Sequence, residues 1–238
     1  MLNTKNYQVW HHRRTLLEWL NYVPQDEDEF ISKILDEDEK NYHGWQYRLS
    51  LVKWLNAWEE DVDFAVGMIE RDLRNNSAWN HKFIIVSHLL AEWDADRPRC
   101  RSLLDGEVEF ALSWIEKCAN NECPFTYLRG LLEVCDVDLL QMKKVTQFFD
   151  RRSGPEPFVL EMQLILAKER CLAEVAANPD VGKAAVKKYD HQLDAILRRL
   201  VEHDPIRRKY WRCLTDSFKR MFENAIAVNQ APADSGRE

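Results

Sequence analysis

The chain contains 238 residues, with 33 Lys and Arg against 40 Asp and Glu, and its formal net charge is −7. Seven glycines and eight prolines are few for a barrel or sandwich, which needs frequent turns, and the composition also excludes collagen-like, disordered and disulfide-scaffold classes. The acidic balance makes nucleic acid a poor default partner. No stretch approaches the ~18 uncharged apolar residues of a membrane span. We therefore expect a helical, well-packed soluble protein with no nucleic-acid partner and no membrane span.

The cysteines and the N-terminal segment indicate a cellular compartment. The first six residues contain no apolar signal core, and the six cysteines are scattered without a Cys-x-x-Cys pair. Such cysteines are expected to be reduced thiols. The sequence therefore predicts a cytoplasmic protein.

An internal repeat organises the first 150 residues or so. Each copy has an aromatic residue with asparagine four positions before it, and most copies have a cation three positions after it. The aromatic residues are Trp10, Trp45, Trp79 and Phe125. Apolar residues follow at offsets 7 and 10, so these positions share one face of an α-helix and predict a structural core. The cations on that face, which we expect to meet carboxylates or helix ends between layers, are Arg13, Arg48 and Lys82.

A second apolar segment with helical spacing follows each of these helices. Acidic residues at 26–29 and 59–61 precede two of the second segments, as is favoured at helix N-termini. The repeat unit is therefore a helix pair, and we expect an all-α fold of stacked antiparallel helix pairs, a solenoid or layered crescent. We predict one domain over residues 1–227, with repeats near 5–37, 40–73, 74–119 and 120–151, C-terminal helices over 156–227, and a disordered tail at 228–238.

The starts of the repeat helices are candidate anion sites. Ser77 is predicted to be the N-cap of its helix, which puts Gln8 and His43 at the equivalent level. Helix N-termini present free N–H groups and partial positive charge to anions. Side-chain donors would gather where two such starts lie side by side, namely Lys5, Tyr7, Tyr42 and His43. The alternative is that these residues are ordinary caps and solvated turns.

Three segments resemble the prenyltransferase α-subunit repeats. They are Lys5–Arg14, Asn41–Arg48 and Arg74–Asn80, and Ile206–Arg212 resembles the C-terminal segment of the same family. More closely, they resemble the α subunit shared by protein farnesyltransferase and geranylgeranyltransferase type I. That α subunit has further repeats before the Lys-Asn-Tyr-Gln motif, whereas Met1 here lies four residues before Lys5.

The resemblance implies a right-handed superhelix, or crescent, wrapped around a β subunit. In the family, the β subunit holds a zinc ion and most of the isoprenoid pocket, and the enzyme transfers farnesyl or geranylgeranyl from its diphosphate to a cysteine in the C-terminal CaaX box of a protein. The resemblance therefore implies an enzyme subunit that is inactive without its β subunit. Other possibilities are the α subunit of Rab geranylgeranyltransferase and a non-catalytic helical-repeat adaptor.

The resemblance also assigns roles to the residues at the helix starts. Lys5, Tyr42 and His43 would be catalytic residues at the diphosphate, with Lys5 stabilising the departing charge. Tyr7 would lie near the diphosphate, and Gln8 would bind the C-terminal carboxylate of the protein substrate. We expect no cofactor in this chain: zinc belongs to the β subunit, and magnesium is an option for the farnesyl reaction.

Overall fold

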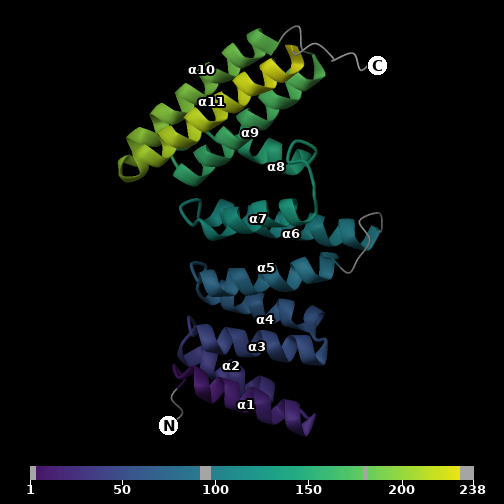
Figure 1. Cartoon of the computed structure of the whole chain (residues 1–238). Coiled ribbons are helices and arrows are strands. Elements are labelled where there is room, and N and C mark those ends of the chain that lie inside the picture. The colour runs from purple at the N-terminus through teal and green to yellow at the C-terminus, as the bar shows by residue number, and fades with distance from the viewer. Residues whose placement is uncertain (1–3, 92–97, 179–181, 231–238) are drawn as a thin grey trace, which may run out of the picture. The chain divides into compact units, whose positions relative to one another are not determined.

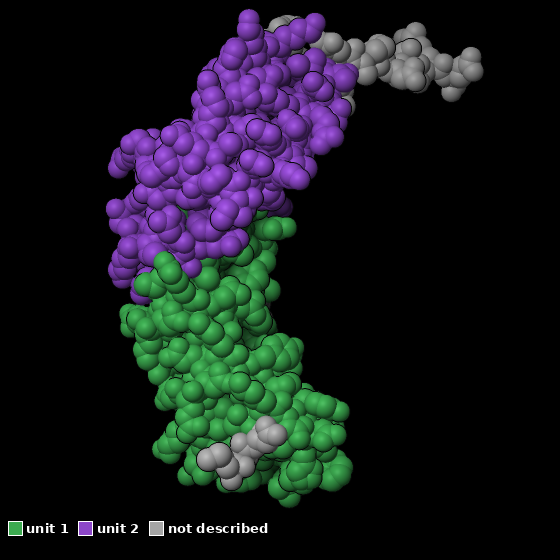
Figure 2. All heavy atoms as spheres, turned by 90° about the vertical axis from the view of Figure 1, so that its left-hand side faces the viewer, with its two compact units in different colours: residues 1–111, 123–135 green, residues 112–122, 136–238 purple. Residues whose placement is uncertain are grey.

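The computed structural model describes residues 4–91, 98–178 and 182–230, and every regular element in these ranges is a helix (Figure 1). The chain forms two compact units, coloured separately in Figure 2. Unit 1 comprises residues 1–111 and 123–135, and unit 2 comprises residues 112–122 and 136–238. Helix α6 (Pro98–Lys117) contributes to both units. The predicted all-α fold is confirmed.

Unit 1 is a stack of helix pairs. The first helices of successive pairs are α1 (Tyr7–Leu20), α3 (Tyr42–Leu55), α5 (Asn76–Ala91) and α7 (Cys123–Val134). The second helices in this unit are α2 (Glu27–Glu37), α4 (Trp58–Arg71) and the N-terminal part of α6. Helix α1 contacts α3, α3 contacts α5, and α5 contacts α7, so the first helices form one continuous layer (Figure 1). The predicted helix-pair repeat is confirmed.

The repeated aromatic residue anchors each first helix. The four side chains are buried: Trp10, Trp45, Trp79 and Phe125. Each tryptophan also donates its indole N–H to a carbonyl six residues earlier, and the acceptors are Thr4 at 2.7 Å, Glu39 at 2.9 Å and Leu73 at 3.0 Å. The aromatic residue therefore fixes both the packing of its helix and the path of the chain that leads into it.

Asparagine caps these helices. The side-chain oxygens of Asn6, Asn41 and Asn75 accept the amide N–H of Gln8 at 3.0 Å, Gly44 at 3.1 Å and Ser77 at 3.1 Å. The prediction that placed Ser77, Gln8 and His43 at the cap was wrong, because these residues lie inside the first turn. An asparagine four residues before the aromatic residue already supplies the side-chain acceptor that a helix start needs.

The same asparagines connect neighbouring repeats. Asn41 Nδ2 donates to the carbonyl of Thr4 at 3.2 Å, and Asn75 Nδ2 donates to the carbonyl of Glu39 at 3.1 Å. These two carbonyls also accept the indole N–H groups of Trp10 and Trp45. The shared acceptors hold the starts of consecutive first helices side by side.

Ion pairs that are buried or half-buried join the first helices to the second helices. The cation three residues after each tryptophan meets a carboxylate of the second helix: Arg13 Nε to Glu27 at 2.6 Å, Arg48 Nη2 to Asp61 at 2.5 Å, and Lys82 Nζ to Glu107 at 2.6 Å. The prediction for these cations is confirmed. Each carboxylate also bonds to a residue two positions after the next aromatic anchor, and these residues are Tyr47, His81 and Tyr127.

Unit 2 contains α8 (Lys143–Asp150), α9 (Pro157–Ala177), α10 (Gly182–His203), the short 3-10 helix η2 (Pro205–Arg207) and α11 (Arg208–Gln230). The core lies among α9, α10 and α11, where α11 contributes Trp211, Phe218 and Phe222. Helix α11 continues three residues into the predicted tail at 228–238 and ends two residues before Pro232, a residue that disfavours helix immediately before it. The rest of the predicted tail, from residue 231, lies outside the described residues.

Candidate functional site

Two helix starts meet at one edge of unit 1. Tyr7 and Tyr42 are the first residues of α1 and α3, and both side chains are exposed. Lys5 lies two residues before α1, and its side chain is 81% exposed, with Nζ 3.7 Å from a carboxylate oxygen of Asp38. An exposed ion pair of this length is weak. The ammonium of Lys5 can therefore turn toward an anion at little cost.

The structure brings part of the predicted set together. Tyr7 and His43 line the same groove, and the ring of Tyr42 lies edge-on to that of His43, with centroids 5.6 Å apart. Gln8 is exposed in the first turn of α1, and its backbone N–H is bound by the cap. Neither Lys5 nor Gln8 is among the residues that line the groove. The predicted donors therefore lie around the edge where α1 and α3 begin. Of these donors, Tyr7 and His43 line the groove between the two helices.

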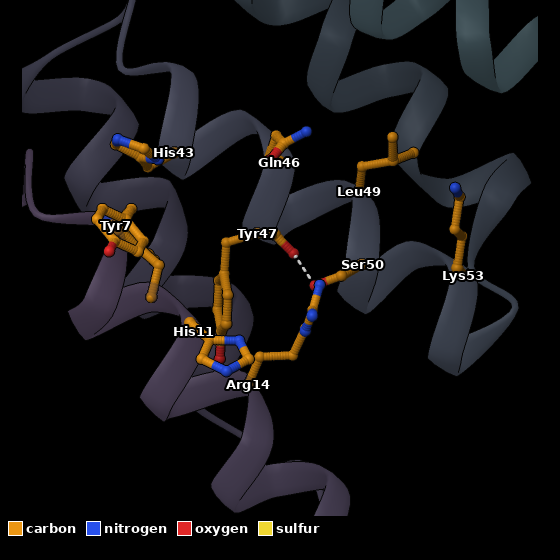
Figure 3. Close-up of a pocket in the computed structure, with 10 residues that line it drawn as sticks. Tyr7, His11, Arg14, His43, Gln46, Tyr47, Leu49, Ser50 and Lys53 are labelled. Carbon is orange, nitrogen blue, oxygen red and sulfur yellow. Dashed lines mark hydrogen bonds between the residues drawn. The ribbon is translucent and has the colours of Figure 1, made fainter.

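The groove between α1 and α3 has a volume of about 610 Å³ (Figure 3). Its polar lining comes from both helices and includes Tyr7, His11, Arg14, His43, Gln46 and Lys53. The repeat pattern predicted Tyr7 and His43 at the site but not the other four. They lie on the helices beyond the first turn, whereas the free N–H groups that predict an anion site belong to the helix starts.

Tyr47 forms a rigid part of the groove wall. Its hydroxyl donates to Glu27, a side chain that is 1% exposed and that also accepts two hydrogen bonds from Arg13, both at 2.6 Å. Burial, together with the neighbouring carboxylate, raises the pKa of Tyr47, so the phenol stays protonated. Burial alone would raise the pKa of Glu27, but the hydrogen bonds from Arg13 and Tyr47 outweigh burial and lower it. The groove wall is therefore held by a charged carboxylate.

We expect Glu27→Gln to lower the free energy of unfolding by about 1–3 kcal/mol at pH 7, since hydrogen bonds to a charged group are lost. Because the pKa of Glu27 is lower in the folded state than in the unfolded state, its ionisation stabilises the fold above the unfolded pKa, and this contribution disappears as pH falls through the folded pKa. The difference between variant and wild type should therefore shrink below about pH 4. Urea unfolding at pH 7 and pH 3.5 measures it.

The control is Glu29→Gln, which lies on the same helix and removes an exposed pair with Lys33. That variant should match wild type within error at both pH values. A Glu27→Gln penalty of equal size at pH 7 and pH 3.5 would contradict the ionised state of Glu27.

The described residues contain no group of three or more His, Cys, Asp or Glu side chains that could hold a metal ion. Among the same residues, no helix is long and apolar enough to cross a membrane. What the helix starts and the groove offer chemically is a set of cations, ring nitrogens and hydroxyls. Such groups bind and orient anions.

Three comparisons with known proteins extend these findings. The model of the protein prenyltransferase alpha subunit repeat matches residues 1–20, 24–55 and 58–89. A relative from Dictyostelium discoideum, described as protein farnesyltransferase/geranylgeranyltransferase type-1 subunit alpha, is 42% identical over 66 residues. That match covers 28% of this chain and 19% of the relative, so it spans about a fifth of the relative's length.

A solved structure shares the fold. A chain in the structure of Candida albicans protein geranylgeranyltransferase-I complexed with GGPP aligns with a TM-score of 0.70 at 24% sequence identity. The alignment covers 91% of this chain and 68% of that chain. The all-α arrangement of helix pairs is therefore one that a prenyltransferase subunit adopts.

Proposed function

We propose, because the chain carries protein prenyltransferase alpha subunit repeats, that it is the α subunit of a heterodimeric protein prenyltransferase of the farnesyltransferase/geranylgeranyltransferase type I kind. The enzyme would transfer farnesyl or geranylgeranyl from its diphosphate to a C-terminal CaaX-box cysteine. The observation that carries the proposal is the pair of helix starts tied to the carbonyl of Thr4, with Lys5, Tyr7, Tyr42 and His43 around them.

This chain would act on the leaving group. As the bond between the isoprenoid carbon and the diphosphate oxygen breaks, negative charge grows on that oxygen. An ammonium, a ring N–H and phenol hydroxyls beside two helix N-termini would stabilise such charge more in the transition state than in the ground state. The proposed partner subunit would hold a zinc ion, which would favour ionisation of the substrate's own cysteine thiol to the attacking thiolate. In this scheme the chain binds and orients the diphosphate and has no activity alone.

The relative from Dictyostelium supports this enzyme type over a Rab-specific one, because that relative is described as the α subunit shared by farnesyltransferase and geranylgeranyltransferase type I. A non-catalytic adaptor is the other alternative. It predicts that the purified chain forms no complex with a prenyltransferase β subunit. Co-expression with the β subunits of farnesyltransferase, geranylgeranyltransferase type I and Rab geranylgeranyltransferase, followed by co-purification, separates these possibilities.

The chemical test is Lys5→Ala in the reconstituted heterodimer. We expect single-turnover prenyl transfer to fall about 100-fold, the typical cost of removing one donor from developing oxyanion charge. Binding of the isoprenoid diphosphate should weaken much less, since the lost interaction is strongest in the transition state. Lys33→Ala, an exposed lysine on α2, is the control and should leave both quantities unchanged. An unchanged single-turnover rate in Lys5→Ala would remove Lys5 from the site.

Gln8→Ala should behave differently in the same assay. If its amide binds the C-terminal carboxylate of the protein substrate, the contact is equal in ground and transition states. We therefore expect a higher KM for the peptide substrate with little change in kcat. A fall in kcat at unchanged KM would contradict the carboxylate-binding role.

A further inference from the structure

The internal repeat allows each groove between first helices to be compared with its equivalents. The groove between α5 and α7 has a volume of about 200 Å³, and its lining includes Asn80, Phe83, Cys123 and Thr126. These residues stand at the same offsets from their aromatic anchors as His11, Arg14, His43 and Gln46 in the groove between α1 and α3. The two grooves are therefore the same structural feature carrying different side chains.

Positive charge distinguishes the groove between α1 and α3 from the groove between α5 and α7, whose lining in the described part of the chain contains no cation. Four residues after the aromatic anchor, α1 has Arg14 and α7 has Arg129, whereas α3 has Leu49 and α5 has Phe83. Eight residues after it, α3 has Lys53, whereas α7 has Glu133. Because the same helix stack forms with apolar or acidic residues at these positions, stacking does not require the cations. Their presence in one groove points to a ligand.

The surroundings reinforce this charge. The groove-lining residues among those described comprise two full cations and two histidines, with no aspartate or glutamate. The chain as a whole has an excess of acids, 40 Asp and Glu against 33 Lys and Arg. Arg14 pairs with Glu18 at 3.4 Å, but both side chains are about half exposed, so the pair is weak and can be exchanged.

The dimensions of the groove indicate the shape of its occupant. His43 and Lys53 lie ten residues apart on α3, which corresponds to about 15 Å along a helix. An extended peptide covers that distance with about five residues. The rings of Tyr7, Trp10 and Tyr47 provide apolar wall between the charged groups. Figure 3 shows His43 and Lys53 toward opposite ends of the lining and Arg14 between them.

We propose that this basic groove, defined by His11, Arg14, His43 and Lys53, binds a short extended acidic segment of another polypeptide. The identification of that polypeptide as the catalytic partner subunit rests on the proposed function. The binding chemistry does not, because carboxylates spaced along an extended strand match Arg14 and Lys53 whatever chain carries them. Tyr7 and His43 would then serve both the diphosphate edge and the near end of the groove.

The test uses the full chain and fluorescence anisotropy with a dye-labelled hexaglutamate peptide. We expect saturable binding that weakens as salt increases. The variant Arg14→Gln/Lys53→Gln should raise the Kd about 10-fold. The matched control, Lys33→Gln/Arg99→Gln, also removes one lysine and one arginine from exposed ion pairs of unit 1 and should change the Kd less than about twofold. Circular dichroism verifies that both variants are folded.

Absence of saturable hexaglutamate binding to the wild-type chain would overturn the proposal. Equal weakening in the two double variants, or equal binding of hexaglutamine, would overturn it, since binding would then follow net charge or no charge at all. Binding of inorganic diphosphate that Arg14→Gln/Lys53→Gln weakens as much as it weakens peptide binding would also overturn it and assign the groove to small anions. Because prenyl transfer is not measured, hexaglutamate binding can succeed while the enzymatic role fails. If both hold, Arg14→Glu/Lys53→Glu should reduce co-purification with the partner subunit.

Discussion

Replacing Lys82 by methionine is expected to lower the free energy of unfolding by about 3–5 kcal/mol, because it leaves a buried carboxylate without its counter-ion. The Lys82 side chain is 1% exposed, and its Nζ donates to both oxygens of Glu107, at 2.6 and 2.5 Å. Burial lowers the pKa of Lys82, and the neighbouring Glu107 only partly opposes that shift. In the variant, Glu107 retains the hydroxyl of Tyr127, at 2.6 Å. Urea unfolding followed by circular dichroism measures the loss.

A second variant shows whether the loss comes from the unpaired charge. Lys82→Met/Glu107→Gln removes both charges while keeping an acceptor for Tyr127, so it should recover at least about 1 kcal/mol relative to Lys82→Met. Lys33→Met makes the same substitution in the exposed pair with Glu29 and should be indistinguishable from wild type. If the loss of unfolding free energy in the double variant equalled the sum of the losses in Lys82→Met and Glu107→Gln, the two side chains would not interact and the pair would be solvated.

The sequence predicts the repeat well because its signal is spread over many positions. Trp10, Trp45, Trp79 and Phe125 recur at a helical face, and each is buried in the structure. The helix face that carries the aromatic residue and the two apolar residues must turn toward the core, so the sequence pattern predicts which side of each helix is buried. The cations on that face also require acidic partners, because a buried charge is otherwise too costly.

The partners of those cations could not be predicted. Glu27 lies 17 residues after Trp10, Asp61 lies 16 after Trp45, and Glu107 lies 28 after Trp79. The carboxylate is the first residue of α2, the fourth of α4 and the tenth of α6, so no fixed spacing marks it. The second helices also carry several exposed acids, and sequence alone does not distinguish these from the buried one.

The ends of the first helices contain a repeat signal that sequence analysis did not use. Eleven residues after the aromatic anchor stand Asn21, Asn56 and Asp136, each in the left-handed region, with φ of 47°, 53° and 50°. Asparagine and aspartate tolerate this conformation better than other non-glycine residues, so they terminate the helices where glycine would usually be found. Because few glycines are present, the sequence did not indicate where these left-handed turns lie.

The groove residues were missed for a related reason. Repeat analysis looks for positions that stay the same between copies, whereas Arg14 and Lys53 stand where the copies differ. In a repeat protein the shared positions describe the stack. A binding surface unique to one layer appears only when the structure shows which variable positions face the same cavity.

Trp45→Ala is expected to destabilise the fold by about 3–5 kcal/mol, the usual cost of removing a large buried aromatic side chain. Trp45 is 6% exposed and packs against Phe64 and His81, with ring centroids 5.9 and 5.0 Å away. Its indole N–H also donates to the carbonyl of Glu39, which is shared with Asn75 of the next repeat. Alanine would therefore leave a cavity and weaken the junction between two layers.

The matched control for Trp45→Ala is Trp19→Ala, which removes an equally large side chain that is 79% exposed on α1. We expect that control to change the free energy of unfolding by no more than about 0.5 kcal/mol, as surface substitutions usually do. Comparing urea unfolding of the two variants separates burial in the repeat stack from the mere loss of an aromatic residue. If Trp45→Ala changed stability as little as Trp19→Ala, the aromatic position could not be the anchor of the repeat. A large loss of stability in Trp45→Ala alone would support Trp45 as the anchor of its repeat. It would also agree with the shared carbonyl of Glu39, which accepts hydrogen bonds from both Trp45 and Asn75.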